Sequence, residues 1–589
     1  MMEILQSLRN KMQENKIDIY LVPTGDPHGS EYPPDAYKYR TFLTGFTGSA
    51  GVAVVFKDKA YCWADGRYYI QAGKQLEGSG FNLQKDGQPG VLSPYDYVIK
   101  MAQEGDTVGF HGELLMMKDL KRLESQRPDL SFKAVDLMTD LWEGRPSLPQ
   151  EPMFILKNAY TKFTTLEKRD QVMEELKKYK ADSLVLSSLD DIAWFTNLRG
   201  RDIENNPVFL SFLTLDKKHL VLYIDLRKID QEIVEYFEQQ KIVVKEYHDF
   251  YEDIKKLKGK KILLDPSKTN ALVYNHLREK NQLIEAINPT TMLKAVKNKV
   301  ELNNLKAAYV DDGVALVKYF SWLNQEISAG KTITEYEAQN KLIDFRKNIV
   351  DYIEDSFTPI SAYGANGAMM HYSAQKESTV IGKDSFYLID SGGQYLRGTT
   401  DITRTLHFGQ PTEEEKRDYT LVLKSQISLA NTIFLEGTKG SQLDAIARRP
   451  IWQYHMDYKC GTGHGVGYLL NVHEGPHRIS RWTEDCPLEE GYIVTIEPGI
   501  YKEDMYGIRL ENDVAVKLDG TAPDGTFYSF DMLSYIPFDR KCINPELLTQ
   551  EERQWLNRYN EQVYDLLAPN LNKEEEEYLS IQTEAFSEK

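Results

Sequence analysis

Residues 385–409 have the sequence SFYLIDSGGQYLRGTTDITRTLHFG, in which an apolar run ends in Asp390. Two glycines turn the chain, and a second run then carries Asp401. Apolar runs on either side of a glycine turn are typical of a β-hairpin. The sequence therefore predicts a hairpin-like unit that delivers two carboxylates.

Residues 490–516 follow the same plan, with the sequence EGYIVTIEPGIYKEDMYGIRLENDVAV. The apolar run 492–496 ends in Glu497, Pro-Gly interrupts it, and the returning run carries Glu511. A carboxylate at the end of a buried strand is unfavourable unless its charge is neutralised. Four such carboxylates predict a site for cations.

A glycine-rich stretch between the two hairpins, YKCGTGHGVGYLLNVHEGPH at 458–477, contributes His464 and then His473. Four carboxylates and one imidazole form an oxygen-rich ligand set that suits Mn²⁺, Fe²⁺, Co²⁺ or Zn²⁺. The lack of thiolates argues against a structural zinc site. Carboxylates can also bridge two metal ions, which a site with five protein ligands needs.

Each of these residues has an ordinary explanation when it is taken alone. An Asp beside a glycine turn is usually only a turn residue, and Glu-Pro-Gly can simply end a strand. Five residues in two similar hairpins that flank a histidine loop are a more specific pattern. The candidate metal ligands are Asp390, Asp401, His464, Glu497 and Glu511.

The composition limits the function classes. A chain of 589 residues is too long for one core and is expected to hold about three or four domains. Its net charge of −18 and its lack of a basic block argue against nucleic-acid binding, which depends on neutralising phosphates. The four cysteines form no CxxC pair, and no apolar run is long enough for a membrane span or a signal peptide. We therefore expect a soluble, cytoplasmic protein with no nucleic-acid or membrane partner.

Two segments upstream of the hairpins resemble loose copies of one plan: helix, apolar strand, aromatic–glycine stretch, strand, then Asp-x-Arg. The first copy ends at YCWADGR (61–67) and the second at LVLYIDLR (220–227). Short apolar runs separated by helices predict α/β layers, and chance similarity between two such units is the alternative. With linkers at 143–153 and 286–298, the predicted domains are residues 1–147, 148–290 and 291–589.

Several stretches resemble the pita-bread metallopeptidases, a fold shared by aminopeptidase P, prolidase and methionine aminopeptidase. The similarity to the three-domain cytosolic aminopeptidase P (Xaa-Pro aminopeptidase) family covers nearly the whole chain. It implies an α/β (α+β) protein with two creatinase-like N-terminal domains and a C-terminal pita-bread domain. The matching stretches are GDPHGSEY (25–32), GSAGVAVV (48–55), ADGRYYIQA (64–72), DIAWFTNLRG (191–200), GANGAMMHY (364–372), IDSGGQY (389–395), TTDITRT (399–405), GTGHGVG (461–467), NVHEGP (471–476), EPGIY (497–501) and GIRLEN (507–512).

By motif position, the resemblance implies two divalent ions at the five candidate ligands, with Mn²⁺ preferred over Zn²⁺, Co²⁺ or Fe²⁺. It implies that Asp401 and Glu511 bridge the two ions. Asp390 would complete the shell of one ion, and His464 and Glu497 that of the other. Ions about 3.5–4 Å apart would lower the pKa of a shared water so that hydroxide attacks the substrate, with Glu497 as the candidate general base.

The resemblance also implies four residues that face the substrate: His371 of GANGAMMHY, His473 of NVHEGP, Arg67 of ADGRYY and Arg509 of GIRLEN. His371 and His473 are candidates for stabilising the oxyanion. Either histidine could instead be satisfied by a hydrogen bond in the core, and Arg67 by a surface salt bridge. Cys460 stands where the family often has histidine, and it is expected to be a small packed thiol.

The implied reaction is hydrolysis of the first peptide bond in peptides that have proline in the second position, by a homodimeric enzyme. A prolidase would share the metal site but usually has one N-terminal domain, and a methionine aminopeptidase usually lacks both. A creatinase-like hydrolase would lack the full ligand set. A catalytically inactive binding protein of the same fold is the remaining alternative, and the intact ligand set argues against it.

Overall fold

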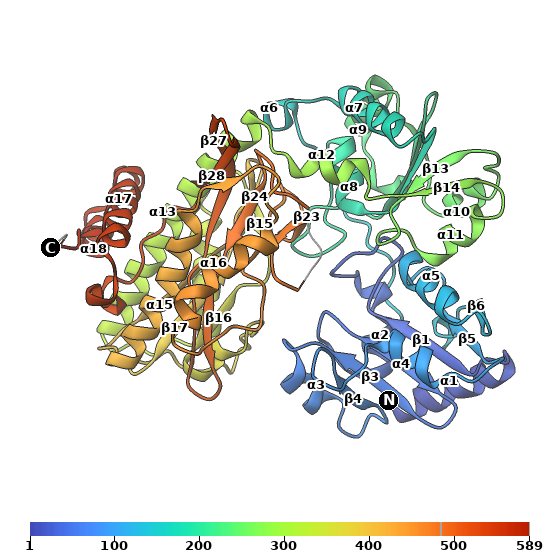
Figure 1. The fold of residues 1–589 in the computed structure, drawn as a ribbon, viewed down its shortest axis with the longest axis horizontal. Coiled ribbons are helices and arrows are strands. Elements are labelled where there is room, and N and C mark those ends of the chain that lie inside the picture. The colour runs from blue at the N-terminus through green and yellow to red at the C-terminus, as the bar shows by residue number, and fades with distance from the viewer. Residues whose placement is uncertain (483–485, 588–589) are drawn as a thin grey trace. The chain divides into compact units, whose positions relative to one another are not determined.

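The computed structural model describes residues 1–482 and 486–587, and Figure 1 traces the chain from its N-terminus to its C-terminus. The chain forms two compact units. Unit 1 comprises Met1–Ile155, Phe163–Glu204 and Val208–Thr291, and unit 2 consists chiefly of the chain from Met292 onward. Among the helices of the described ranges, none has both the length and the apolar composition required to cross a membrane.

Unit 1 begins with a six-stranded sheet in the order β4-β3-β2-β1-β5-β6. The buried strand β1 (Ile19–Pro23) follows the helix α1 (Met2–Glu14) and pairs antiparallel with β2 (Val52–Phe56) and parallel with β5 (Thr107–Phe110). Helices α4 (Pro94–Met101) and α5 (Met117–Gln126) contribute Val98 and Leu120 to the core of this sheet. The remaining strands are β3 (Ala60–Ala64), β4 (Asn82–Lys85) and β6 (Ser131–Ala134).

A second six-stranded sheet in unit 1 has the order β12-β11-β10-β8-β13-β14, which reproduces the first sheet strand for strand. Strand β1 pairs antiparallel with β2 and parallel with β5, and β8 pairs in the same way with β10 and β13. A bidentate pair follows the third strand of each copy, Arg67 with Asp65 and Arg227 with Asp225. The predicted repeat is therefore confirmed. The strands are β8 (Ser183–Leu186), β10 (Ser211–Asp216), β11 (Leu220–Ile224), β12 (Val243–Glu246), β13 (Lys261–Leu264) and β14 (Gln282–Glu285).

The motif GDPHGSEY joins the two halves of unit 1. His28 is almost fully buried, and its ring nitrogens contact the Ser187 carbonyl and the Tyr247 hydroxyl, each at 2.9 Å. The side-chain amide of Asn270 donates to the Pro27 carbonyl at 2.8 Å. Burial lowers the pKa of His28, which favours a neutral ring that can make both contacts. The motif therefore ties the first sheet to the second.

Unit 2 contains the two predicted hairpins together with long helices. Helix α13 (Lys299–Ser328) begins with a capping box, in which Asn298 and Glu301 satisfy each other's backbone N–H groups. Three further helices, α15 (Glu413–Ala430), α16 (Gly440–Trp452) and α17 (Gln550–Leu567), contribute Tyr419, Ile451 and Tyr559 to one core. Residues of this core also come from β26 (Tyr506–Arg509), which lies in the second hairpin.

The first hairpin consists of β17 (Phe386–Ser391) and β20 (Ile402–His407), with Asp390 opposite Thr403. Between these strands the chain makes a smaller hairpin of β18 (Gly393–Tyr395) and β19 (Gly398–Thr399). A Cβ atom at Gly392 would lie 1.8 Å from the Thr400 carbonyl oxygen, so only glycine fits where the two hairpins meet. Where the sequence predicts a glycine turn between β17 and β20, the structure thus has a short hairpin of β18 and β19. The outer hairpin also pairs with β16 (Ile360–Tyr363), and the inner one with β15 (Tyr352–Asp355).

The second hairpin has the same nested arrangement. Its outer strands, β24 (Ile493–Ile496) and β27 (Asn512–Ala522), pair with Ile496 opposite Asn512, and they enclose β25 (Gly499–Lys502) and β26 (Tyr506–Arg509). The outer strands belong to the sheet β21-β28-β27-β24-β22-β23. Both carboxylate-bearing hairpins are therefore confirmed. The other strands of the sheet are β21 (Phe434–Leu435), β22 (Gly463–Gly465), β23 (Glu474–Ile479) and β28 (Gly525–Met532).

The predicted fold class is confirmed by two similar α/β halves in unit 1 and by mixed sheets and helices in unit 2. The domain boundaries at residues 147 and 290 stay a prediction.

Candidate metal centre

The two hairpins and strand β22 bring the candidate ligands toward one place. The carboxylates occupy equivalent positions in the two hairpins, next to the paired ends of the outer strands. The backbone N–H of Glu511 donates to the Thr403 carbonyl at 3.1 Å, which joins one hairpin to the other. Asp390 lies near the end of β17, Asp401 directly before β20, Glu497 directly after β24, Glu511 directly before β27, and His464 in the middle of β22.

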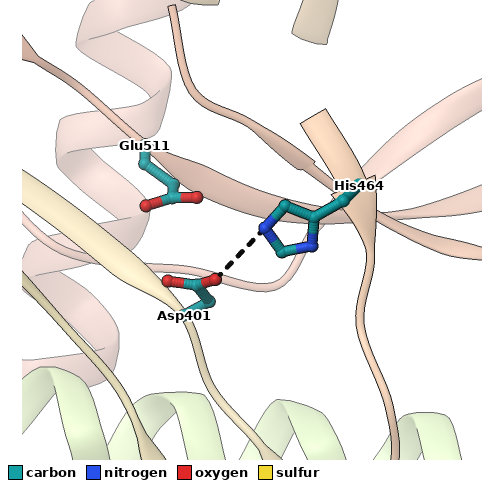
Figure 2. Close-up of side chains that lie close together, drawn as sticks. All are labelled: Asp401, His464 and Glu511. Carbon is teal, nitrogen blue, oxygen red and sulfur yellow. Dashed lines mark ion pairs between the residues drawn. The ribbon is translucent and has the colours of Figure 1, made fainter. Parts of the chain in front are cut away.

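Figure 2 shows the carboxylates of Asp401 and Glu511 and the ring of His464 turned toward one another. Each of these side chains offers one ligand atom, and the three atoms lie within 4.8 Å of one another. His464 Nε2 is 3.5 Å from Asp401 Oδ2 and 3.7 Å from Glu497 Oε1. Three of the five candidates are thus close enough to share an ion, and Glu497 borders them.

The tautomer of His464 also indicates a cation. Its Nδ1 lies 2.9 Å from the Gly465 carbonyl oxygen, and because a carbonyl only accepts, Nδ1 is the donor. In a neutral ring, Nε2 then presents a lone pair to the carboxylates of Asp401 and Glu497. A lone pair facing two carboxylates is repulsive unless a proton or a metal ion lies between them. Histidine ligands of metals are usually held in this way, through the other ring nitrogen.

Burial and neighbouring acids raise the pKa values of Asp401, Glu497 and Glu511. Burial, reinforced by the charges of the neighbouring acids, holds the pKa of Asp401 and of Glu511 well above its usual range. Burial raises the pKa of Glu497 to about 7, against the opposing effect of Arg509. Asp390 Oδ1 is buried without a hydrogen-bond partner among the described residues. An oxygen-rich group of buried acids fits divalent ions, which would neutralise these charges.

Arg509 is buried and contacts a candidate metal ligand directly. Its Nη2 donates to Asp390 Oδ2 at 2.6 Å, its Nη1 to the Tyr501 hydroxyl at 2.8 Å and its Nε to Thr403 Oγ1 at 3.2 Å. Thr403 in turn donates to Glu511 Oε2 at 2.6 Å. These contacts indicate that Arg509 orients Asp390, while its predicted contact with the substrate stays a prediction.

Replacing Arg509 with lysine is expected to weaken metal binding about 10- to 100-fold, as is typical of residues that orient metal ligands. Lysine keeps the charge but lacks the planar fork that reaches Asp390 and Thr403 together. Titration of the metal-free protein with Mn²⁺ measures the effect. Arg397→Lys is a matched control, because Arg397 forms a bidentate pair with Asp351 and not with a candidate ligand. An equal loss of affinity in both variants would contradict this role.

The sequence interpretation did not include Asp513, a buried acid beside the candidate ligands. Burial raises its pKa well above the usual range, against hydrogen bonds from Tyr309 and from the backbone of Asp401. Residues two apart in a strand face the same side of the sheet. Because Asp513 follows Glu511 by two positions in GIRLEND, this spacing could have identified it.

His473 lies directly against the cluster. The rings of His473 and His464 are 4.4 Å apart between centroids and packed edge to face. The next residue, Glu474, is buried and forms ion pairs with Lys294, at 3.4 Å, and with Lys297. These ion pairs fix the start of β23 beside His473. Its predicted contact with the substrate is not tested by this geometry.

The two remaining candidates for substrate contact are His371, which is exposed, and Arg67, which belongs to unit 1. His371 is exposed on the loop between η4 (Gly364–Ala368) and β17. Arg67 belongs to unit 1, where it forms its bidentate pair with Asp65. The substrate contacts of His371 and Arg67 stay predictions. Cys460 packs against the core of unit 2, and burial together with the charge of Glu497 raises its pKa to about 12, so the expected packed thiol is confirmed.

Family models match both the segments that form unit 1 and the segment that carries the candidate metal ligands. Metallopeptidase family M24 matches residues 303–517, and the C-terminal region of peptidase_M24 matches 526–586. Two models of the creatinase/prolidase N-terminal domain match residues 4–145 and 144–301. The two N-terminal matches correspond to the two similar sheets of unit 1.

The chain is similar over its whole length to named relatives. The "Probable Xaa-Pro aminopeptidase P" of Neurospora crassa is 40% identical over 582 residues, which cover 95% of this chain and 85% of that protein. The protein of the same name from Sordaria macrospora is also 40% identical, with 95% of both chains covered.

Solved structures give the same result. The X-prolyl aminopeptidase from Caenorhabditis elegans, described as a cytosolic enzyme with a di-nuclear active site, matches with a TM-score of 0.94 and 32% identity over 99% of both chains. The Xaa-Pro dipeptidase from Bacillus anthracis matches with a TM-score of 0.51 and 25% identity, over 64% of this chain and 99% of that one. The chain therefore belongs to metallopeptidase family M24 and, within it, to the Xaa-Pro aminopeptidase P family.

Proposed function

We propose that this protein is a metal-dependent aminopeptidase that hydrolyses the N-terminal Xaa-Pro bond of peptides. The observation that carries the proposal is the convergence of Asp401, His464 and Glu511, with Glu497 at their border. A prolidase is less well supported, because the dipeptidase of B. anthracis matches 64% of the chain whereas the aminopeptidase of C. elegans matches 99%.

Two divalent ions would be held by the five candidate ligands, and we propose Mn²⁺. When bound, such ions lower the pKa of the attacking water and polarise the scissile carbonyl. The di-nuclear active site of the C. elegans relative supports the number of ions. The ligand set of four carboxylates and one imidazole supports a metal such as Mn²⁺.

Glu497 is proposed to carry the proton. Its carboxylate lies 3.7 Å from His464 Nε2, at the border of the cluster, where it would accept a proton from the attacking water and pass that proton to the leaving nitrogen. His473, which packs against His464, and His371 are proposed to donate hydrogen bonds to the oxyanion. A substrate amino group placed beside an acidic ligand would restrict cleavage to the first bond.

Peptide hydrolysis with and without a chelator tests the function. Arg-Pro-Pro is expected to lose its first residue, the chelator to stop the reaction, and readdition of single metals to restore it, with Mn²⁺ most effective. Hydrolysis that is indifferent to the chelator would contradict the proposal. A protein that neither cleaves peptides nor binds a transition metal would instead be an inactive binding protein of this fold.

Arg-Pro-Pro is expected to be cleaved at least about tenfold faster, in kcat/KM, than Arg-Ala-Ala. A pocket shaped for the pyrrolidine ring would fit a nitrogen that carries no N–H and would hold it in the reactive orientation. Initial rates at matched concentrations measure the ratio. Equal rates would contradict the preference for proline, and activity confined to the dipeptide Arg-Pro would favour a prolidase.

We also propose that the protein is a cytoplasmic homodimer. The cytosolic description of the C. elegans relative supports the compartment. Support for the dimer comes from an exposed aromatic patch, in which Trp452 is 40% and Trp482 51% exposed and Arg481 stacks on Trp482 at 4.4 Å. Aromatic and arginine side chains of this kind are enriched at protein interfaces.

Sedimentation at micromolar concentration is expected to give twice the 67.9 kDa mass of one chain. Exposed aromatic side chains lose contact with water when two copies associate, which favours the dimer. A single species with the mass of one chain would contradict the dimer.

A further inference from the structure

A buried carboxylate outside the metal centre organises a loop of unit 2. Glu335 is the first residue of helix α14 (Glu335–Arg346) and is 0% exposed. The neighbouring acid Glu337 satisfies the N-terminus of the helix, where it accepts hydrogen bonds from the backbone and the hydroxyl of Thr334. The side chain of Glu335 is therefore not needed as a cap, and it points to another part of the chain.

The carboxylate of Glu335 holds both ends of the segment 363–379. It accepts hydrogen bonds from the Tyr363 backbone N–H at 2.6 Å and from the Thr379 backbone N–H at 3.2 Å. Between these ends, it accepts from Asn366 Nδ2 at 2.9 Å and from the Tyr372 hydroxyl at 2.7 Å. Hydrogen bonds to a carboxylate are among the strong ones in proteins. One side chain thus closes the loop and also holds its interior.

The backbone of Glu335 adds to this connection. Its N–H donates to the Thr379 carbonyl at 3.0 Å, and its carbonyl accepts from Ser361 Oγ at 2.7 Å. The segment itself carries the short helix η4 and has no other regular structure across 364–378. A loop of this kind has high conformational entropy unless it is tied down. Its order therefore depends on contacts with Glu335.

The loop also lies against the hairpin of the metal centre. A Cβ atom at Gly507 would lie 1.7 Å from the Gly367 carbonyl oxygen, so η4 touches β26 through two glycines. Strand β26 ends at Arg509, which binds Asp390. His371 is carried by the same loop, next to Tyr372. The contacts of Glu335 thus hold the loop that carries His371, and this loop packs against the hairpin that carries Arg509.

We propose that Glu335 is a positioning residue for the reaction, and that it places His371 for contact with the substrate by holding the loop 363–379. This inference rests on the proposed function. The carboxylate of Glu335 contacts Tyr363, Asn366, Tyr372 and Thr379, and its effect on catalysis would pass through His371.

The test begins with Glu335→Gln. Tyr363 N–H donates to Oε1 of Glu335 and Thr379 N–H to Oε2, so glutamine, which keeps the shape but has one oxygen and one NH2 group, loses one of these two hydrogen bonds and sets two donors against each other there. We expect kcat/KM for Arg-Pro-Pro to fall about tenfold or more, with the same division between kcat and KM as in His371→Ala. Bound metal is expected to remain at the wild-type level. Glu337→Gln, the same substitution two residues away, is the matched control and is expected to keep wild-type kcat/KM.

A double-mutant cycle separates positioning from general stability. In a His371→Ala background, Glu335→Gln is expected to cause little further loss, because both changes remove the same interaction. A full additional loss in that background would overturn the proposal, as would wild-type kinetics in Glu335→Gln. If Glu335→Gln does not fold, Tyr372→Phe removes a single hydroxyl beside His371, and the same cycle is measured with that variant.

Amide hydrogen exchange makes the result independent of activity. Glu335→Gln is expected to speed exchange in residues 364–378 and to leave α15 unchanged, whereas uniform acceleration or no acceleration would overturn the proposal. Should the wild-type protein fail to cleave Xaa-Pro peptides, the proposed function would fall. The exchange data would then still decide whether Glu335 holds the loop.

Discussion

Replacing Glu497 with glutamine is expected to lower kcat by about 10³-fold, within the range found for removal of a general acid–base group. Glutamine is close to glutamate in size but cannot accept and return a proton. Glu497 lies 3.7 Å from His464 Nε2, which places its carboxylate beside the candidate metal ligands where the attacking water would be held. Steady-state kinetics with Arg-Pro-Pro measure the loss, and circular dichroism checks that the fold survives.

The bound metal must be measured in the same variant, because Glu497 is also a candidate ligand. A large loss of kcat with both ions retained would assign the proton transfer to Glu497, whereas loss of an ion would assign it chiefly to metal binding. Glu490→Gln is the control, since Glu490 is exposed and lies before the same strand. Near-normal kcat in Glu497→Gln or in Glu497→Ala would refute the assignment.

Removing the divalent ions is expected to abolish hydrolysis and to destabilise the protein, more strongly at high pH than at low pH. Without ions, the buried carboxylates repel one another, and the pKa of Asp401 and of Glu511 lies well above its usual range. The pKa of Glu497 is raised to about 7. In the unfolded chain these groups titrate near pH 4.

The raised pKa values fix the direction of the pH effect. Between about pH 4 and pH 7, the folded metal-free protein holds protons that the unfolded chain has released, so its free energy of unfolding falls as the pH rises. The stabilising contribution of the protonated acids is fully present below about pH 4 and is lost as the pH passes through the folded-state values. Metal ions bind the deprotonated acids and restore stability at high pH.

Thermal unfolding of the chelated and the Mn²⁺-loaded protein between pH 5.5 and pH 8.5 checks this expectation. The difference in Tm between the two forms should widen as the pH rises. Asp401→Asn removes one of the repelling acids and should flatten the pH dependence of the metal-free form. A difference in Tm that is constant across this range would contradict the electrostatic account.

The hairpins and their acids could be predicted from the sequence because the signals are local. Asp390 and Glu497 each follow an apolar run, and a strand that ends in an acid beside glycine or proline is recognisable without tertiary information. The repeat in unit 1 was recognisable for the same reason, since each copy ends in Asp-x-Arg. In both cases, the order and spacing of the residues along the chain were enough to predict the local structure.

The contacts that orient the ligands could not be predicted in this way. Arg509 reaches Asp390 across 119 residues of sequence, and Glu335 holds backbone groups 28 and 44 residues away. Which polar group a buried side chain meets depends on how the strands pack, and no periodicity records that packing. The observed contacts of Arg509 are with Asp390, Thr403 and Tyr501, and the contact with the substrate that the resemblance implies stays a prediction.

The nested hairpins affect the order in which the protein is expected to fold. Asp390 and Asp401 flank strands of one sheet, and Glu497 and Glu511 flank strands of another. The two pairs meet only where the two sheets pack together, so we expect the electrostatic penalty to arise late in folding. Recovery from denaturant should therefore show a final phase whose rate depends on the concentration of divalent cations, while the initial collapse does not. Chains that are synthesised without such cations are expected to accumulate in a partly folded state that precedes this final phase.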